Sequence, residues 1–154
     1  MTEKNIFPQV LQDAIETGDA SKVLDAAVTH FGCVAGSVHW LNADNLLELA
    51  ASKNLPPPIV EAVRLVPIGK GIAGAAAERM EPVSICNLQT DTSGTARPSA
   101  KTTGMEGSLA VPITKDGKLQ GVIGIAKIQA YEWSPEEMSL LTATGNALAE
   151  KRGS

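Results

Sequence analysis

The sequence predicts an α+β fold with a central antiparallel sheet flanked by helices. The chain has 154 residues, of which 44% are hydrophobic and 19% are charged, enough for the core of a single domain. Two pairs of β-type segments are each joined by a short polar turn, and segments with helical periodicity lie near both ends of the chain. Hairpins with helices before and after them favour an antiparallel sheet with helical layers. We expect one domain over residues 1–154.

Two helices are predicted at the N-terminus. Apolar residues recur at helical spacing over residues 8–17, and Gly18 is placed to end this helix. Asp19 then provides the N-cap of a second helix, whose apolar stripe extends to Phe31. Residues 1–20 are therefore expected to form a helical flank of the domain.

A first hairpin follows these helices. β-Branched and small residues over 33–41 predict a strand, polar residues 42–45 a turn, and residues 46–52 the partner strand. Three prolines at 56–58 end that strand and open a short helix, which is expected over residues 59–65.

A glycine-rich stretch, VPIGKGIAGAAAERMEPVSIC, comes next. It predicts a short extended segment, a glycine turn, a helix over residues 72–80 and a strand over residues 83–86. Residues 87–106 are polar and rich in Thr, Ser and Gly. A structureless connection of about 20 residues inside a compact domain is uncommon and usually marks a functional lid or disorder. We expect a lid here, with a surface loop as the alternative.

The second hairpin has the clearest turn signal in the chain. Asp116 and Gly117 favour a type I′ turn between strands over residues 107–114 and 118–129.

The last helix has an equally clear start. Ser134 is its N-cap, and Glu137 lies where a capping box requires a glutamate, so residues 135–154 are expected to form a second helical flank. Four residues form a seam along it, namely Met138, Leu141, Gly145 and Leu148. This seam favours a homodimer through the terminal helices, and packing of the seam on the sheet is the alternative.

The composition excludes several classes of protein. A formal net charge of −4 argues against a nucleic-acid-binding module, which usually has a basic patch. No apolar run approaches the roughly 20 residues of a membrane helix, and the N-terminal sequence lacks the apolar core of a signal peptide. We therefore expect a cytoplasmic protein with neither nucleic acid nor a membrane as a partner. Cys33 and Cys86 are too few for a disulfide scaffold or a structural zinc site.

Five short motifs, in this order, resemble those of the GAF domain, a small-molecule sensor module of bacterial signalling proteins. They are PIGKGIAG at 67–74, EPV at 81–83, GSLAVPI at 107–113, GVIGI at 121–125 and WSPEE at 133–137. The resemblance extends over most of the chain. It implies a central antiparallel sheet with terminal helices on one face and, on the other, a ligand pocket under a long lid loop over residues 87–106. It also implies a sensory or regulatory function in signal transduction, in which binding of a small molecule changes the conformation.

Candidate ligand-binding residues lie on the first strand. If side chains alternate along it, Cys33, Ser37 and His39 share its more polar face, which suits a pocket, and Trp40 lies on the apolar face. His39 is a candidate hydrogen-bonding group for a ligand, and a histidine of the core is the alternative.

Further candidates lie in and beside the 87–106 segment. Arg97 and Lys101 are four residues apart, so one helical turn would place both on one face, where a basic pair favours an anionic ligand. A solvated loop whose charges pair with nearby acids is the alternative. The remaining candidates are two residues at the start of the segment and two hydroxyl-bearing residues near its end, namely Cys86, Asn87, Thr103 and Ser108.

No cofactor is predicted. Gly69, Gly71 and Gly74 spell the dinucleotide motif G-x-G-x-x-G, but the acid expected about 20 residues later is missing. We expect these glycines to permit a tight turn and close packing. His30, with one cysteine and one other histidine nearby in the sequence, supplies too few ligands for zinc or haem. The motifs of bilin-binding and cyclic-nucleotide-binding relatives are not matched either.

An enzyme is the alternative function. Some GAF relatives reduce free methionine sulfoxide with several cysteines near the pocket, which makes a small thiol-dependent redox enzyme the second candidate. Cys86 is close to the predicted lid, but a thiol reductase cycle needs a resolving thiol nearby, and the lid contains no cysteine.

The expected ligand is small. Aromatic residues are only 3% of the chain, and none lies in the glycine turn or in residues 87–106, so the pocket is expected to be aliphatic and polar. The signal would pass to an effector, which is expected to act in trans unless the chain is a segment of a larger protein.

Overall fold

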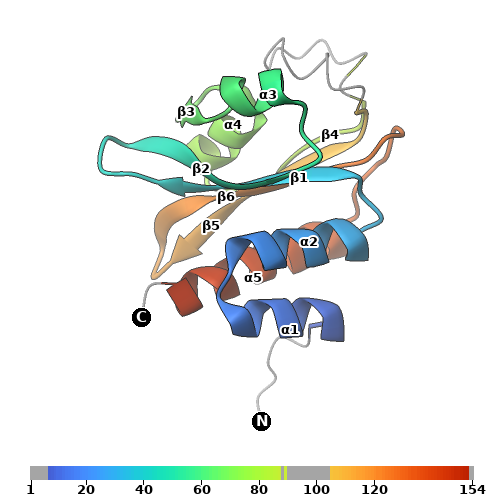
Figure 1. The fold of residues 1–154 in the computed structure, drawn as a ribbon, viewed down its shortest axis with the longest axis horizontal. Coiled ribbons are helices and arrows are strands. Elements are labelled where there is room, and N and C mark those ends of the chain that lie inside the picture. The colour runs from blue at the N-terminus through green and yellow to red at the C-terminus, as the bar shows by residue number, and fades with distance from the viewer. Residues whose placement is uncertain (1–6, 88, 90–104, 153–154) are drawn as a thin grey trace.

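Helices cover both faces of a six-stranded sheet (Figure 1). This computed structural model describes residues 7–87, 89 and 105–152. On one face of the sheet lie α1 (Gln9–Thr17), α2 (Ala20–His30) and α5 (Pro135–Arg152), and on the other lie the shorter α3 (Pro57–Ala62) and α4 (Gly71–Arg79). The predicted α+β class, with the terminal helices on one face, is confirmed.

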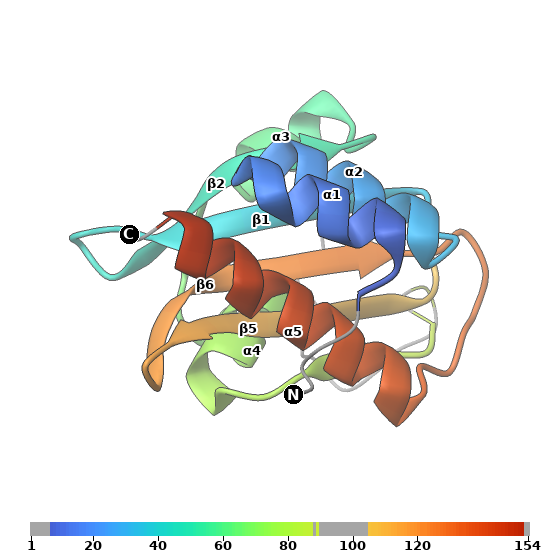
Figure 2. The same cartoon turned by 90° about the horizontal axis from the view of Figure 1, so that it is seen from below.

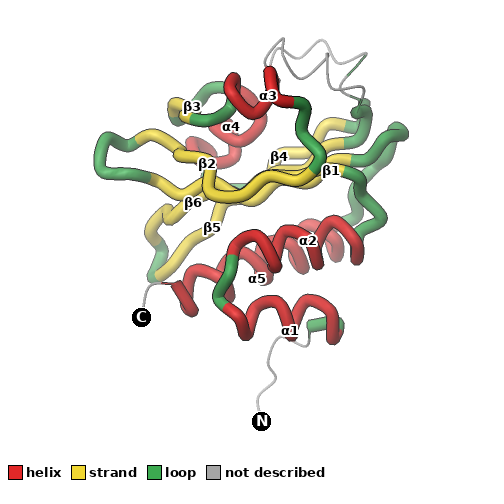
Figure 3. The backbone as a smooth tube through the Cα atoms, in the orientation of Figure 1, coloured by secondary structure: helices red, strands yellow, loops and turns green. Residues whose placement is uncertain are grey.

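The two predicted hairpins meet at the centre of the sheet. The strand order is β3-β2-β1-β6-β5-β4, and neighbouring strands are antiparallel. The strands are β1 (Ala35–Leu41), β2 (Leu46–Lys53), β3 (Leu65–Pro67), β4 (Val83–Ile85), β5 (Ser108–Lys115) and β6 (Lys118–Ala126). Because β1 and β6 are paired, segments far apart in the sequence lie side by side in the middle of the sheet (Figure 3).

The local signals read from the sequence have their expected geometry. Gly18 ends α1 in the left-handed conformation with φ 68°, and the Asp19 carboxylate accepts a hydrogen bond of 2.9 Å from the N–H of Ser21. Asp116 and Gly117 have φ values of 54° and 76°, as a type I′ turn requires.

The capping box at the start of α5 is also confirmed. The N–H of Glu137 donates to the Ser134 hydroxyl at 3.1 Å, and the N–H of Ser134 donates back to the Glu137 carboxylate at 2.9 Å. The Tyr131 hydroxyl donates to the other oxygen of that carboxylate at 2.6 Å.

Two predicted strand boundaries are wrong. The strand expected from Cys33 begins at Ala35, because the N–H of Cys33 bonds to the Val28 carbonyl at 2.8 Å and completes the end of α2. The strand expected to reach residue 129 ends at Ala126, since its partner β5 does not extend past the residue that pairs with Ala126. The predicted alternation therefore does not include Cys33.

The short helix after the prolines is also shorter than predicted. It ends at Ala62 instead of residue 65, because Leu65 pairs with Glu48 and belongs to β3. This turn back onto the sheet brings α3 over the strands.

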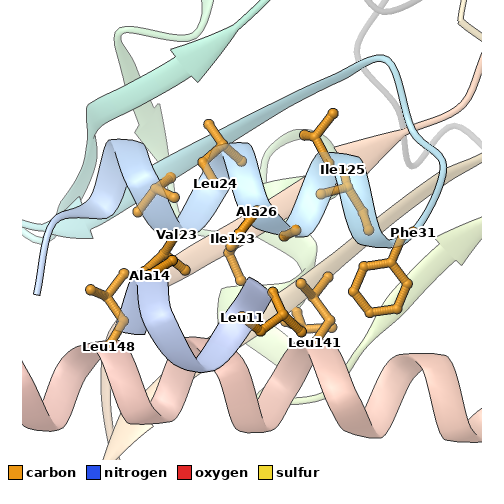
Figure 4. Packing of buried hydrophobic residues seen from close by; sticks show 14 of the residues in the cluster. Leu11, Ala14, Val23, Leu24, Ala26, Phe31, Ile123, Ile125, Leu141 and Leu148 are labelled. Atoms are coloured by element: carbon orange, nitrogen blue, oxygen red, sulfur yellow. The ribbon is translucent and has the colours of Figure 1, made fainter. Parts of the chain in front are cut away.

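The larger of two apolar clusters lies between the sheet and the terminal helices (Figure 4). Figure 2 shows these three helices lying across the same face of the sheet. Leu141 and Leu148 of α5 are fully buried, which contributes about 2 kcal/mol each. Between them, Gly145 allows close approach, since a Cβ there would lie 2.9 Å from a side-chain carbon of Ile113.

Three of the four residues of the predicted seam, Leu141, Gly145 and Leu148, therefore pack within the domain, as the alternative interpretation stated, whereas Met138 is only partly buried. A second, smaller apolar cluster lies between the sheet and α4 and includes Leu47, Ala76 and Val122. In the part of the chain that the structure describes, no helix has the length and apolar character needed to cross a bilayer.

Candidate functional site

A cavity of about 160 Å³ lies between the sheet and the helices α3 and α4. Its walls come from β1, β5 and β6 on the sheet side and from α3, β3 and the start of α4 on the other. Most of the described lining is aliphatic, and the polar side chains in it are Ser37, His39, Lys70 and Ser108. The cavity is on the face of the sheet opposite the terminal helices, which is where the resemblance to known sensors implies a pocket.

The alternation of β1 explains why Ser37 and His39 reach this cavity. Side chains of successive strand residues point to opposite faces. Ser37 and His39 accordingly line the cavity, while Val38 and Trp40 belong to the apolar cluster under the terminal helices. The polar face and the apolar face of this strand are thus placed as the sequence predicts.

His39 is the most deeply buried polar side chain of the described lining, with 2% of its surface exposed. Its Nε2 lies 2.8 Å from the carbonyl oxygen of Val63 in the turn after α3. A carbonyl only accepts, so Nε2 carries the proton, and in a neutral ring Nδ1 is then an acceptor. Burial lowers the pKa of His39, which favours the neutral ring, and the hydrogen bond to Val63 opposes this effect in part.

The other nitrogen of His39 has no partner. Nδ1 is buried and makes no hydrogen bond with any described residue. An unpaired buried acceptor costs about 1 to 3 kcal/mol, so native proteins seldom leave one without a partner. A donor from a bound molecule would remove this cost.

The glycine turn before α4 contributes Lys70 to the described lining of the cavity. Gly69 and Gly71 have φ values of 94° and 68°, and a Cβ on Gly74 would lie 2.6 Å from the Pro67 carbonyl oxygen. These three glycines therefore permit a tight turn and the close packing of the first turn of α4 against it, as predicted from the sequence. The turn places Lys70 and the first residues of α4 in the cavity wall.

On the β5 side, Ser108 is buried in the cavity wall beside Met105. Ser37, His39 and Ser108 are thus three predicted site residues that the structure brings together. Whether they bind a ligand remains a prediction.

Cys86 and Asn87 lie elsewhere. Neither belongs to the described lining of the cavity. Cys86 is exposed, and its carbonyl accepts a hydrogen bond from the N–H of Tyr131. The Asn87 side chain accepts from the N–H of Gln89, whose own side chain donates to the Met105 carbonyl at 2.7 Å. The two ends of the 87–106 segment are therefore tied together.

The other predicted site residues, Arg97, Lys101 and Thr103, lie outside the described residues, as does most of the predicted lid. The prediction of a basic pair facing an anion stays a prediction.

Lys70 and Gly124 are among the cavity residues that were not predicted from the sequence. Lys70 lines the cavity from the N-terminal end of α4, and the backbone of Gly124 on β6 leaves open space, since a Cβ there would approach nothing closer than 3.6 Å. Lys70 could have been found from its position in a glycine turn directly before a predicted helix. Gly124 could have been found from the alternation of the second hairpin.

Cys33 does not share the cavity with His39. Its side chain packs with the cluster under the terminal helices, and burial raises the pKa of its thiol to about 11 despite the opposing charge of Lys127. His30 stacks edge-on against Phe31 with ring centroids 5.0 Å apart. Within the described residues, no group of three or more His, Cys, Asp or Glu side chains is placed to hold a metal ion.

Comparisons with known proteins agree with this geometry. A family model described as GAF domain matches residues 3–150. A search of curated proteins gave no match.

Solved structures with the same fold include GAF domains and an enzyme. The GAF domain of an Acinetobacter phosphoenolpyruvate-protein phosphotransferase has a TM-score of 0.76 at 20% identity, covering 94% of this chain and 91% of that chain. A GAF sensor protein from Burkholderia vietnamiensis has a TM-score of 0.74 at 16% identity, with 95% of each chain covered. The free methionine-R-sulfoxide reductase from Neisseria meningitidis, solved with its substrate, has a TM-score of 0.75 at 14% identity, covering 94% of this chain and 86% of that chain.

Proposed function

The chain belongs to the GAF domain family, and on this premise we propose that it is a sensory or regulatory domain that binds a small metabolite in the cavity between the sheet and α3 and α4. The observation that carries the proposal is His39, a buried side chain of the cavity wall whose Nδ1 has no partner among the described residues. A group that costs free energy in the empty protein and gains a partner on binding is typical of a ligand site.

The size of the cavity supports a small ligand. A space of about 160 Å³ is close to the volume of an apolar cavity that holds a single benzene molecule. The described aromatic residues lie outside the described lining, so a flat aromatic cofactor has no stacking partner there. A compact aliphatic metabolite fits these properties better.

A thermal-shift screen of the purified chain against a metabolite library tests the proposal. A ligand present at about 100 times its dissociation constant adds about 2.7 kcal/mol of stability, which corresponds to a rise of roughly 5 to 10 °C in Tm for a domain of this size. The control is a pair of variants at Gly124, where a side chain has room to enter the cavity.

Gly124→Leu fills the cavity, whereas Gly124→Ala leaves most of it open. A ligand of the cavity should stabilise the wild type and Gly124→Ala but not Gly124→Leu, with circular dichroism confirming that both variants fold. If no compound shifts the Tm, or if Gly124→Leu retains the shift, the cavity is not the ligand site.

A thiol-dependent redox enzyme related to free methionine sulfoxide reductase is the second candidate, favoured by the likeness of the fold to such an enzyme and by the exposure of Cys86. Against it stands the position of Cys33, the only other cysteine of the sequence, which packs under the terminal helices with a raised pKa. Methionine sulfoxide turnover that is lost in Cys86→Ser would favour the enzyme, whereas ligand binding that is retained in this variant would favour the sensor.

We further propose a cytoplasmic homodimer that acts on an effector protein, with the outer face of α5 as the contact. Met138, Ala143 and Ala147 border a shallow hollow on that face, beside Pro82. Light scattering across a concentration series tests the dimer, and a constant monomer mass at high concentration would contradict it.

A further inference from the structure

His39, whose Nδ1 is a buried acceptor without a described partner, belongs to one wall of the described cavity, and Lys70 and the first residues of α4 belong to another. From this we infer that the ligand is a short aliphatic hydroxy-carboxylate, whose hydroxyl donates to Nδ1 of His39 and whose carboxylate lies at Lys70 and the N-terminus of α4. This inference rests on the proposed function, because it names the class of ligand for the same cavity.

The hydroxyl end follows from the proton position on His39. The Val63 carbonyl at 2.8 Å requires a proton on Nε2, so Nδ1 of the neutral ring offers a lone pair and no proton. A carboxylate oxygen also offers only lone pairs and would repel Nδ1. The group that binds there must bring its own O–H or N–H.

The carboxylate end follows from the start of α4. The first N–H groups of an α-helix lack intrahelical acceptors and carry a partial positive charge. No side chain caps this helix, and its first residues, Gly71, Ile72 and Ala73, line the cavity together with Lys70. Backbone donors beside a lysine are a favourable environment for an anion.

The choice between a hydroxyl and an ammonium group follows from the charges of the lining. Lys70 is its one basic side chain in the neutral-histidine state, and the described lining contains no aspartate or glutamate. Within the described lining, an ammonium group would have no carboxylate side chain to balance it, and an unbalanced buried charge is costly. A hydroxyl supplies the required proton without a charge.

The size of the cavity restricts the carbon skeleton. Comparison with a cavity that holds benzene suggests a molecule of about six to eight non-hydrogen atoms. Ile59 and Val66 are among the aliphatic side chains of the wall, so a short branched carbon chain completes the fit.

Three compounds on one carbon skeleton test the inference by calorimetry with the full chain: α-hydroxyisovalerate, isovalerate and valine. The hydroxy acid should bind at least about tenfold more tightly than either analogue, because isovalerate leaves Nδ1 unpaired and valine brings an ammonium group. Lys70→Met should weaken binding of the hydroxy acid by about three- to tenfold, and the variant should still bind the hydroxy acid more tightly than isovalerate. His39→Phe should remove that preference.

A measurement on the wild type avoids any dependence on the folding of the His39 variant. The ¹⁵N resonance of Nδ1, observed by long-range proton–nitrogen correlation, should show an unprotonated nitrogen in the free protein and should move upfield when the hydroxy acid is added. Isovalerate should leave it in place. A protonated Nδ1 in the free protein would overturn the inference.

Other outcomes would also overturn the inferred ligand class, and they distinguish its failure from a failure of the proposed function. If isovalerate or valine binds as tightly as α-hydroxyisovalerate or more tightly, the ligand is not a hydroxy-carboxylate. If none of the three compounds binds but another library compound stabilises the wild type and not Gly124→Leu, the ligand class is wrong and the sensory function stands. If no compound of the library acts through the cavity, both fail.

Discussion

The N–H of Tyr131 donates a hydrogen bond of 3.0 Å to the carbonyl of Cys86. This bond holds the residue before the 87–106 segment against the connection that leads into α5. On the other side of the segment, the N–H of Glu106 bonds to the Lys127 carbonyl at 2.9 Å, and the N–H of Lys127 bonds to the Gly107 carbonyl at 2.7 Å. The cavity wall at Ser108 is therefore one residue away from the bonds that join the start of β5 to the connection between β6 and α5.

Two glycines of β6 should differ in how much stability they lose when replaced by alanine. A Cβ on Gly121 would lie 2.0 Å from the His39 carbonyl oxygen, a backbone atom that cannot move aside, whereas a Cβ on Gly124 makes only ordinary contacts. Gly121→Ala should lose about 3 kcal/mol of unfolding free energy or fail to fold, and Gly124→Ala should change it by less than about 1 kcal/mol. Urea denaturation measures both, and equal stabilities would mean that β1 and β6 do not approach as described.

The two thiols should differ in reactivity. Burial raises the pKa of Cys33 from 9.0 to about 11, while Cys86 is exposed. At about pH 8 this shift lowers the thiolate fraction of Cys33 about 100-fold, so the native chain should react with Ellman's reagent in one fast and one slow phase. The fast phase should disappear in Cys86→Ser and persist in Cys33→Ser. A fast phase that survives in Cys86→Ser would place Cys33 in a more open environment.

Stability should depend on pH through His39. Burial lowers its folded pKa below the ordinary value of 6.5, so below that pH the unfolded chain takes up a proton that the folded chain does not. The free energy of unfolding should fall as the pH drops from about 6.5 toward the folded pKa, by at most about 1.4 kcal/mol per pH unit, and this contribution should level off below the folded pKa.

Within the described lining, Lys70 is the one ionisable side chain besides His39. Urea denaturation between about pH 5 and pH 7 should therefore show a smaller slope in His39→Phe than in the wild type. Identical slopes would show that His39 titrates normally in the folded protein.

The capping box of α5 should have a measurable effect on stability. Ser134→Ala removes the hydroxyl that accepts the hydrogen bond from the N–H of Glu137, and the free energy of unfolding should fall by about 1 kcal/mol. Ser134→Gly should lower it by only a few tenths of a kcal/mol, because glycine is tolerated at the N-cap. Thermal unfolding by calorimetry compares the two. If alanine and glycine destabilise equally, the loss comes from a source other than the cap.

Much of the fold could be predicted because its signals are local. Gly18, Asp19 and Ser134 act on atoms within a few residues of themselves, and each has its expected geometry. The end of β6 at Ala126 could not be predicted in the same way, because a strand ends where its partner ends, and the pairing with β5 is not visible in the local sequence.

In the candidate site, too, the residues that depend on local pattern could be predicted and those that depend on packing between distant segments could not. Alternation along one strand placed Ser37 and His39 on the cavity side. Lys70 and Gly124 were missed because their position depends on how α4 and β6 pack across the sheet, and Cys86, although close to the predicted lid, lies outside the described lining for the same reason. The orphaned Nδ1 of His39 is a property of three-dimensional packing that no spacing in the sequence reveals.

The two edges of the sheet limit how copies of this chain can meet. Each edge strand, β3 and β4, is only three residues long, and β3 ends in Pro67, which has no N–H to donate. Short edges and proline prevent another chain from adding a strand. Backbone pairing between molecules at these described edges is thereby discouraged, so a contact between copies, as proposed above, would be made by side chains, which can be altered singly by mutation without opening the sheet.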